Sequence, residues 1–544
     1  MDTEHNISGF IVDVVNHRIF KGTIQINNGS IVSIREENVN ESQYILPGLI
    51  DSHIHVESSM LIPSEFARMA VVHGTVATVS DPHEIANVLG LPGMQFMIDN
   101  GKKVPFKFYF GAPSCVPATA FETSGATLGP EEIKELLKRD EIKYLSEMMN
   151  FPGVLYNDKE VMAKLKIAKE YNKPVDGHAP GLKGDAARKY CEAGISTDHE
   201  CFTIEEALDK IAFGMTIQIR EGSAAKNFET LIPLIKDFPE KIMLCSDDKH
   251  PDDLLEGHIN QIVKRAIALG YDPLTVLKVC TYNPVRHYKL DVGLLQEGDP
   301  ADFIIVNNLK DFRVKSTWIN GIMVAKDGKT LIKPVKESTP NIFNAMPIQT
   351  NDIRVEANGS DLKVIRAMEG QLITEKFTVQ AKSRSNFVEN DVVNDILKIV
   401  VLNRYAISKP TVGFISGFGL RKGAIASNVA HDSHNIIAVG TTDQEIIEAI
   451  NLILESKGGI SLVNGNDAEH LPLPVAGIMS NEDGGIVAEK YAKLNREAKA
   501  LGSNLRAPYM TLSFMALLVI PALKLSDKGL FDGTKFEFTS LYEN

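Results

Sequence analysis

One stretch decides the fold, Gly48-Leu49-Ile50-Asp51-Ser52-His53-Ile54-His55, in which an apolar run leads into His-x-His. Side chains alternate between the two faces of a strand, so His53 and His55 point to the same face. Two imidazoles at the end of a buried strand can share one metal ion. The alternative is a pair of structural histidines. Because two ligands are too few for a metal site, the others must lie elsewhere in the chain.

Through the middle of the chain, short apolar segments alternate with amphipathic segments such as 64–73, 159–171 and 184–193. This alternation predicts parallel strands joined by helices. Eight strands separated in this way indicate a (β/α)₈ barrel, whose chemistry lies at the carboxyl ends of the strands. The predicted strands are 49–55, 76–80, 106–110, 144–148, 174–177, 194–198, 215–219 and 242–245.

The segments that flank the predicted barrel are typical of β-structure. Asn28-Gly29 lies between two alternating segments, 23–26 and 31–34, which is a strong hairpin signal. Matching strand patterns occur far downstream, at 302–306 and 314–319. We therefore expect both flanks to build one β-sandwich around an inserted barrel.

The predicted fold class is α/β: a (β/α)₈ barrel inserted in a small composite β-sandwich and followed by a C-terminal α+β domain. Pro340 and Pro347 mark a linker before the third unit, which mixes strand and helix patterns. The predicted domains are 1–45 with 291–335 for the β-sandwich, 46–290 for the barrel and 336–544 for the C-terminal domain.

Side chains suited to metals follow several of the predicted strands. A lone histidine in such a place is more often a loop residue, and Asp247-Asp248 is more often a helix cap. Their recurrence in barrel order is less easily explained in that way. Imidazoles with carboxylates are what a dinuclear cation site with a bridging hydroxide needs. The predicted metal ligands are His53, His55, Glu147, His178, His199 and Asp247.

The composition narrows the class of protein. A formal net charge of −13 at pH 7 disfavours nucleic acid and anionic membranes as partners and fits a small-molecule enzyme. The five cysteines are scattered without a C-x-x-C pair, which is typical of reduced thiols in a cytoplasmic protein. The longest apolar stretch, 515–523, is interrupted by Pro521 and is too short to span a bilayer.

The stretch 46–55, together with the later histidines and aspartate, resembles the metal-dependent amidohydrolase superfamily. Within it, the chain is similar to bacterial adenine deaminases over essentially its whole length. The His-x-His opening names only the superfamily, whereas the motifs around Glu147 and His431 are more specific. The narrower resemblance rests on His55-Val56-Glu57-Ser58-Ser59, Asp81-Pro82-His83-Glu84-Ile85-Ala86-Asn87, Ser146-Glu147-Met148-Met149-Asn150-Phe151-Pro152-Gly153-Val154, Asp176-Gly177-His178-Ala179-Pro180, Arg220-Glu221-Gly222-Ser223 and His431-Asp432-Ser433-His434-Asn435.

This resemblance implies hydrolysis of adenine to hypoxanthine and ammonia by a hydroxide bound to two metals, in purine salvage. It also implies two divalent cations, with Mn²⁺ in first place and Fe²⁺ or Zn²⁺ as alternatives, since oxygen and imidazole ligands suit all three. We expect adenine as the small-molecule partner and a homodimer as the assembly. The alternative functions are another cyclic-amide or N-acyl amidohydrolase, or a non-catalytic scaffold.

The expected catalytic roles are divided among four residues. Asp247 is placed to take the proton of the hydroxide and pass it to the departing amine. Glu221 is the first candidate for the acid that protonates the purine ring, and Glu57 is the second. An ion pair with a neighbouring Lys or Arg is the alternative role of Glu221. His83 is expected to contact substrate or orient another group, with a structural loop histidine as the alternative.

Two further assignments have alternatives. Many superfamily members bridge their metals with a carboxylated lysine, and Lys143 lies an even number of residues before Glu147, so both could face inward. We choose Glu147 because it lies at the end of the strand. In the third unit, His431 and His434 belong to a predicted loop. They either form a structural turn or reach the barrel mouth and help to close the substrate pocket.

Overall fold

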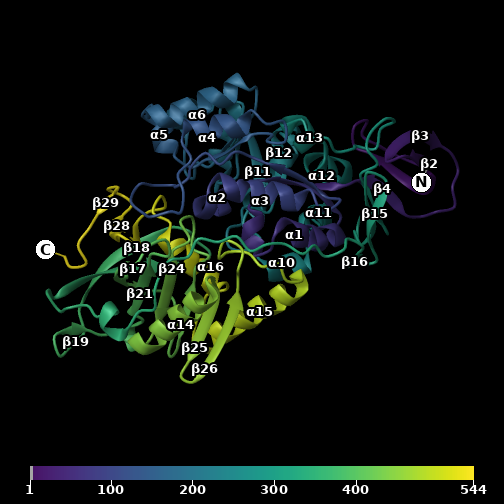
Figure 1. The fold of residues 1–544 in the computed structure, drawn as a ribbon. Helices are drawn as coiled ribbons and strands as arrows, with labels where there is room; N and C mark the ends of the chain where they lie inside the picture. Colours follow the sequence, from purple (N-terminus) through teal and green to yellow (C-terminus); the bar gives the residue numbers. More distant parts are fainter. Residues whose placement is uncertain (1–3, 544) are drawn as a thin grey trace.

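The computed structural model of the chain describes residues 4–543 and has three parts (Figure 1). In the middle part, helices surround short parallel strands. A sheet built from both flanks of that part lies at one end, beside the N-terminus. The C-terminal part, green to yellow in Figure 1, lies against the middle part at α10, α15 and α16. Their bounds are Pro251–Glu256 for α10, Gly484–Ala500 for α15 and Pro508–Ser513 for α16.

The eight inner strands occupy the segments that the apolar pattern predicts, with ends that differ by a few residues. Three of these strands end one residue before a predicted ligand, namely His55, His178 and His199. The strands are β5 (Leu49–Ile54), β6 (Thr75–Ser80), β7 (Lys107–Phe110), β8 (Leu145–Met148), β9 (Val175–Gly177), β10 (Thr197–Asp198), β11 (Thr216–Arg220) and β12 (Ile242–Cys245).

These strands pair in chain order into a closed ring. Parallel ladders join β5 to β6 and β7, β8 to β9, and β10 to β11 and β12. Isolated parallel bridges join the groups: Ala112 with Leu145, Val175 with Ile195, and Ile54 with Asp247. The last of these connects the final strand to the first. The carboxyl ends of all eight strands therefore meet at one rim.

Helices cover the outside of the ring because each has one apolar face. In α8 (Ile204–Ala212), Ala207 and Ile211 are four residues apart and lie in the same buried cluster. The helix begins after Thr203, whose hydroxyl accepts a hydrogen bond from the Glu206 amide. The other outer helices include α1 (Pro63–Ala70), α2 (His83–Leu89), α3 (Leu91–Gly101), α4 (Pro130–Leu137), α6 (Lys159–Glu170), α7 (Gly184–Glu192), α11 (Ile259–Ala268), α12 (Pro273–Val279) and α13 (Tyr282–Tyr288).

The two flanks of the ring form one continuous sheet in the order β16-β15-β14-β13-β4-β1-β2-β3. Its halves join where β4 pairs with both β1 and β13. Ile45 on one face belongs to the sheet's own core, whereas Leu46 on the other face packs with the ring. The strands are β1 (Glu4–Asp13), β2 (Arg18–Asn27), β3 (Ser30–Glu36), β4 (Tyr44–Pro47), β13 (Phe303–Val306), β14 (Val314–Ile319), β15 (Ile322–Lys326) and β16 (Lys329–Thr330).

The C-terminal part is built on a second eight-stranded sheet, in the order β18-β17-β22-β21-β24-β23-β25-β26. Helix α14 (Asp443–Ser456) covers one face, where its Ile450 packs with Ala438. Ile437 on the other face belongs to the large core that also contains the ring. The strands are β17 (Asp361–Ala367), β18 (Thr374–Gln380), β21 (Leu397–Leu402), β22 (Thr411–Ser416), β23 (Ala424–Ser427), β24 (Ile436–Gly440), β25 (Gly459–Asn464) and β26 (Asp467–Pro472).

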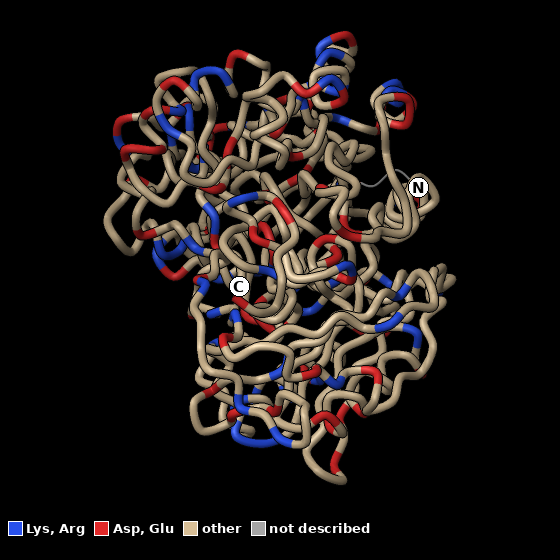
Figure 2. The backbone as a smooth tube through the Cα atoms, turned by 90° about the vertical axis from the view of Figure 1, so that its left-hand side faces the viewer, with Lys and Arg blue, Asp and Glu red and all other residues tan. Residues whose placement is uncertain are grey.

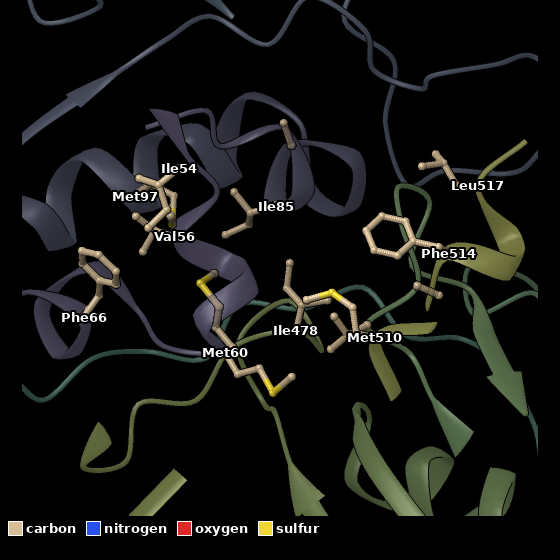
Figure 3. Packing of buried hydrophobic residues seen from close by; sticks show 14 of the residues in the cluster. Ile54, Val56, Met60, Phe66, Ile85, Met97, Ile478, Met510, Phe514 and Leu517 are labelled. Carbon is tan, nitrogen blue, oxygen red and sulfur yellow. The ribbon is translucent and has the colours of Figure 1, made fainter. Parts of the chain in front are cut away.

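One apolar cluster runs without a break from the ring into the C-terminal part. Figure 3 shows Ile85 of the ring side together with Ile478 and Met510 of the C-terminal part, all members of this cluster. Contact between the two parts removes apolar side chains of both from water, and each Å² of apolar surface buried contributes about 25 cal/mol of stabilisation. The C-terminal part is therefore fixed over the rim where the strands end.

Positions of Lys and Arg are interspersed with Asp and Glu over the molecule (Figure 2). Within residues 4–543, no helix combines the length and the apolar character needed to cross a membrane. All five cysteines are free thiols in this structure.

Candidate metal and substrate site

The predicted ligands come from five strands and converge at the rim of the ring. His53 lies in β5, and His55 follows it directly. Glu147 lies in β8, while His178 and His199 follow β9 and β10 without a gap. Asp247 comes two residues after β12. All six side chains are buried, and the structure brings all six together.

Glu147 lies between the histidines of the two sides of the cluster. Its Oε2 is 3.0 Å from Nδ1 of His178 and 3.2 Å from Nε2 of His199. Its Oε1 is 3.5 Å from Nε2 of His55. This one carboxylate therefore faces imidazoles on both sides of the cluster, which would suit an anionic metal ligand.

Asp247 completes the cluster from the opposite side of the ring. Its Oδ1 is 3.2 Å from Nε2 of His55 and 3.6 Å from Nε2 of His53. Its Oδ2 accepts a hydrogen bond of 2.6 Å from Nη1 of Arg220. Arg220 also binds both carboxylate oxygens of Glu200. The guanidinium thus fixes one oxygen of Asp247 and leaves the other toward the histidines.

Opposite charges keep both carboxylates ionised. Burial by itself would raise the pKa of Glu147, but His178 and His199 hold that pKa well below its usual range. Burial would likewise raise the pKa of Asp247, and Arg220 and His199 lower it well below the usual range. Both groups are therefore ready to act as anionic ligands.

The residues fit a pair of cations. Nε2 of His53 is buried without a hydrogen-bond partner among residues 4–543, and it lies 3.6 Å from Oδ1 of Asp247. A buried nitrogen without a partner is costly, and a metal ion would satisfy it. The donors are imidazole nitrogens and carboxylate oxygens with no thiolate, which suits manganese, iron or zinc.

A second polar group adjoins the cluster and includes the loop of the C-terminal part. His83 has Nδ1 3.3 Å from Oδ2 of Asp81 and Nε2 3.5 Å from Oε1 of Glu84. Nδ1 of His431 contacts Oε1 of the same Glu84, and Nε2 of His434 lies 2.5 Å from its Oε2. The loop between β23 and β24 therefore reaches the rim of its own chain, and His83 lies between that loop and the ligands.

Glu221 is the predicted site residue that the structure places elsewhere. Its Oε2 accepts a hydrogen bond of 3.0 Å from Nη1 of Arg265, and Lys226 lies 3.9 Å from it. These cations draw the carboxylate into a different cavity, so the ion-pair alternative describes it. Glu57 is buried but turned to α2, where its Oε1 accepts a hydrogen bond of 3.2 Å from the Ile85 amide.

Between the two polar groups lies a small cavity of about 30 Å³. Its polar lining includes His55, His83, Glu84, Glu147, His178, His199, Glu200, Arg220, Asp247, Asp248, His431 and Asp432. Its apolar lining includes Met149, Leu372, Phe514 and Leu517. A flat, apolar ring with polar edges suits this mixture, because apolar walls take its faces and polar groups take its edges.

Sequence reasoning missed several of these residues. Glu84 and Arg220 lie in the motifs 81–87 and 220–223 that carry the family resemblance. Their position next to His83 and Glu221 in the sequence could have indicated a role in the site. No such signal marks Leu372 and Phe514, because an apolar residue that lines a cavity looks like any core residue until the chain is folded.

Comparison with known proteins gives full-length similarity. Residues 44–324 match the amidohydrolase family, and residues 371–537 match the adenine deaminase C-terminal domain. The adenine deaminase of Methanosarcina mazei is 52% identical over 547 residues, covering 98% of this chain and 99% of its own. That of Sulfurovum sp. is 56% identical over 528 residues, covering 97% and 98%. That of Salinibacter ruber is 52% identical over 544 residues, covering 100% of both chains.

The central position of Glu147 predicts which substitution should weaken metal binding most. Glu147→Gln replaces an anionic ligand by a neutral amide, so metal affinity should fall by about 100-fold or more. Lys143→Ala is the matched control, because Lys143 precedes β8 at the end of the strand away from the cluster. Elemental analysis of the purified variants measures the effect. Loss of metal in Lys143→Ala with full metal in Glu147→Gln would reverse the assignment.

Proposed function

The chain belongs to the adenine deaminase family of the amidohydrolases, and from this premise we propose that it hydrolyses adenine to hypoxanthine and ammonia. Identity of about half of all residues to adenine deaminases over nearly the full length supports this function above the alternative amidohydrolase or scaffold functions. The buried cluster of four histidines and two carboxylates supports a metal-dependent hydrolysis. The product would enter purine salvage.

We propose that the cluster holds two divalent cations, with Mn²⁺ in first place and Fe²⁺ or Zn²⁺ as alternatives. The residues that would hold them are His53, His55, Glu147, His178, His199 and Asp247. When bound, the cations would supply an acidified water near neutral pH.

Asp247 is the proposed base for the attacking water. Its Oδ2 is held by Arg220, so Oδ1 is the oxygen that accepts the proton and returns it to the amine that leaves C6. The ion pair keeps this carboxylate anionic before the attack. Hydrolysis then exchanges the amino group for an oxygen from water, with no other reactant.

The acid that protonates the purine ring is reassigned to Glu84 with His431, in place of Glu221. Glu84 lines the cavity, and both of its oxygens contact histidines of the C-terminal loop. Burial would lower the pKa of His431, but Glu84 and Asp248 raise it to about 9. The pair therefore holds a proton at neutral pH and can share it with a ring nitrogen of the substrate.

Three wider predictions remain proposals. The ring of strands is interpreted as a (β/α)₈ barrel over 46–290 and 336–544 as the C-terminal α+β domain. The composite β-sandwich proposed for 1–45 with 291–335 has its strands in one continuous sheet. The interspersed charges and scattered free cysteines support a cytoplasmic enzyme that acts on a small molecule. A homodimer is the expected assembly.

Turnover of adenine is the direct test of the function. The metal-loaded protein should convert adenine to hypoxanthine and release one equivalent of ammonia. Removal of metal with a chelator should abolish the activity, and Mn²⁺ should restore it. The reaction is followed by the absorbance change of the base together with an ammonia assay. Activity on a cyclic amide but not on adenine would overturn the substrate.

The reassigned acid predicts opposite results for two glutamates. Glu84→Gln removes the carboxylate that shares a proton with His431, so kcat should fall by about 10²- to 10⁴-fold. Glu221→Gln, the matched control, alters only the ion pair with Arg265 and should keep kcat within about threefold. Steady-state kinetics measure the effect. A large fall of kcat in Glu221→Gln with little change in Glu84→Gln would return the acid role to Glu221.

The C-terminal loop predicts a loss of turnover without loss of metal. A His431→Ala, His434→Ala double variant keeps all six ligands of the cluster but leaves Glu84 without its histidine partners. Its kcat should fall by about 100-fold or more, while its metal content stays near that of the wild type. His470→Ala, elsewhere in the same part of the chain, is the control. Unchanged turnover in the double variant would reduce the loop to a structural turn.

A further inference from the structure

The apolar wall of the cavity has a different origin from its polar wall. The proposed ligands come from the ends of the inner strands, whereas Leu372, Phe514 and Leu517 belong to the C-terminal part. In Figure 3, Phe514 and Leu517 lie on the C-terminal side of the apolar cluster. The C-terminal part thus supplies much of the surface that would face a purine ring.

Two segments far apart in the sequence build this wall. Leu372 lies in the turn between β17 and β18, and Phe514 begins the short helix η7 (Phe514–Ala516). Neither residue lies in a strand ladder that would fix its distance from the other. Backbone hydrogen bonds do join Thr374, at the end of that turn, to Pro521 and Ala522, but none joins Leu372 itself to Phe514 among residues 4–543.

Lys524 makes that connection. It lies in β27 (Leu523–Ser526), which pairs with β28 (Gly529–Asp532). Its Nζ donates hydrogen bonds to the carbonyl oxygen of Leu372 at 2.8 Å and to that of Phe514 at 2.9 Å. The side chain therefore joins the two wall segments through their main chains.

Burial of the Lys524 amine costs desolvation free energy, which argues for a specific role of this side chain. Lys524 is 0% exposed, and its hydrogen bonds among residues 4–543 go to carbonyl groups, with no charged partner beside it. Burial lowers its pKa to about 7. An apolar residue would avoid this desolvation cost. What the amine adds to packing is the pair of hydrogen bonds.

The wall also touches the proposed acid. The ring of Phe514 stacks on that of His431, with centroids 4.7 Å apart and an angle of 15° between the planes. His431 in turn contacts Glu84. A shift of the Phe514 backbone would therefore move both the apolar face and the acid relative to the ligands.

We propose that Lys524 is a positioning residue for substrate, which holds Leu372 and Phe514 together as the wall that receives the adenine ring. This inference rests on the proposed adenine deamination. Lys524 itself does not touch the substrate. Its effect should therefore appear in the binding of adenine and in the mobility of the wall, while the metal cluster stays unchanged.

Lys524→Met tests this role, because methionine fills similar space but cannot donate. The KM for adenine should rise by about tenfold or more, with a smaller fall in kcat and with wild-type metal content. Hydrogen–deuterium exchange should become faster in peptides that cover 369–373 and 513–518. Lys524→Arg, which keeps the donors, should recover most of the loss in KM.

Two controls separate this role from a general loss of stability. Lys398→Met removes another buried lysine of the same part, paired with Asp443 at 2.6 Å and remote from the cavity, and should keep the wild-type KM. Leu372→Ala shortens the wall without changing Lys524 and should also raise KM.

The outcomes are distinct. A wild-type KM or unchanged exchange in Lys524→Met overturns the proposal, as does an equal rise of KM in Lys398→Met. Absence of adenine turnover in the wild type refutes the proposed function instead, and the exchange experiment still shows whether Lys524 holds the wall.

Discussion

The site depends on the backbone contact that closes the ring of strands. The amide of Asp247 donates to the carbonyl oxygen of His53 at 2.9 Å, and the amide of His55 donates to that of Asp247 at 3.3 Å. The same two hydrogen bonds join the last strand to the first and place Asp247 beside two imidazoles. Asp247 has a left-handed backbone with φ of 55°, which costs energy for a residue other than glycine. Closure of the ring offsets that cost, together with the parallel ladders on the two sides of this junction, β11 with β12 and β5 with β6.

Charge balance is the second constraint. Four imidazoles and two carboxylates share one buried volume, and each ionised group removed from water is costly unless it is paired. Arg220 relieves this by binding Glu200 and Asp247 at once, outside the ligand face. Nε2 of His53, which has no hydrogen-bond partner among residues 4–543, lies 3.9 Å from Oε2 of Glu147 and 3.6 Å from Oδ1 of Asp247. The cluster is thus arranged for positive charge in its centre.

The C-terminal part converts this metal-type cluster into a closed pocket. Its sheet shares an apolar core with the ring, and its loop brings His431 and His434 to Glu84. Phe514 adds an apolar face next to that pair. In the proposed function, the ring supplies the hydrolytic residues, while the C-terminal part shapes the space for the substrate. The residues of the cluster and the residues that shape the pocket therefore come from different parts of the chain, in keeping with sites that are grafted on a common scaffold.

The sequence by itself determined the strands of the ring and the six converging side chains. Both follow from local rules: the period of two along a strand makes His53 and His55 share a face, and parallel strands place His178, His199 and Asp247 at one rim. Only the tertiary structure decided which glutamate faces the cavity. Glu221 and Glu84 both follow strand ends, and their directions depend on partners distant in sequence, Arg265 for one and His431 for the other. The wall of Leu372 and Phe514, joined by Lys524, was beyond sequence reasoning for the same physical reason: a contact between distant segments leaves no local periodicity.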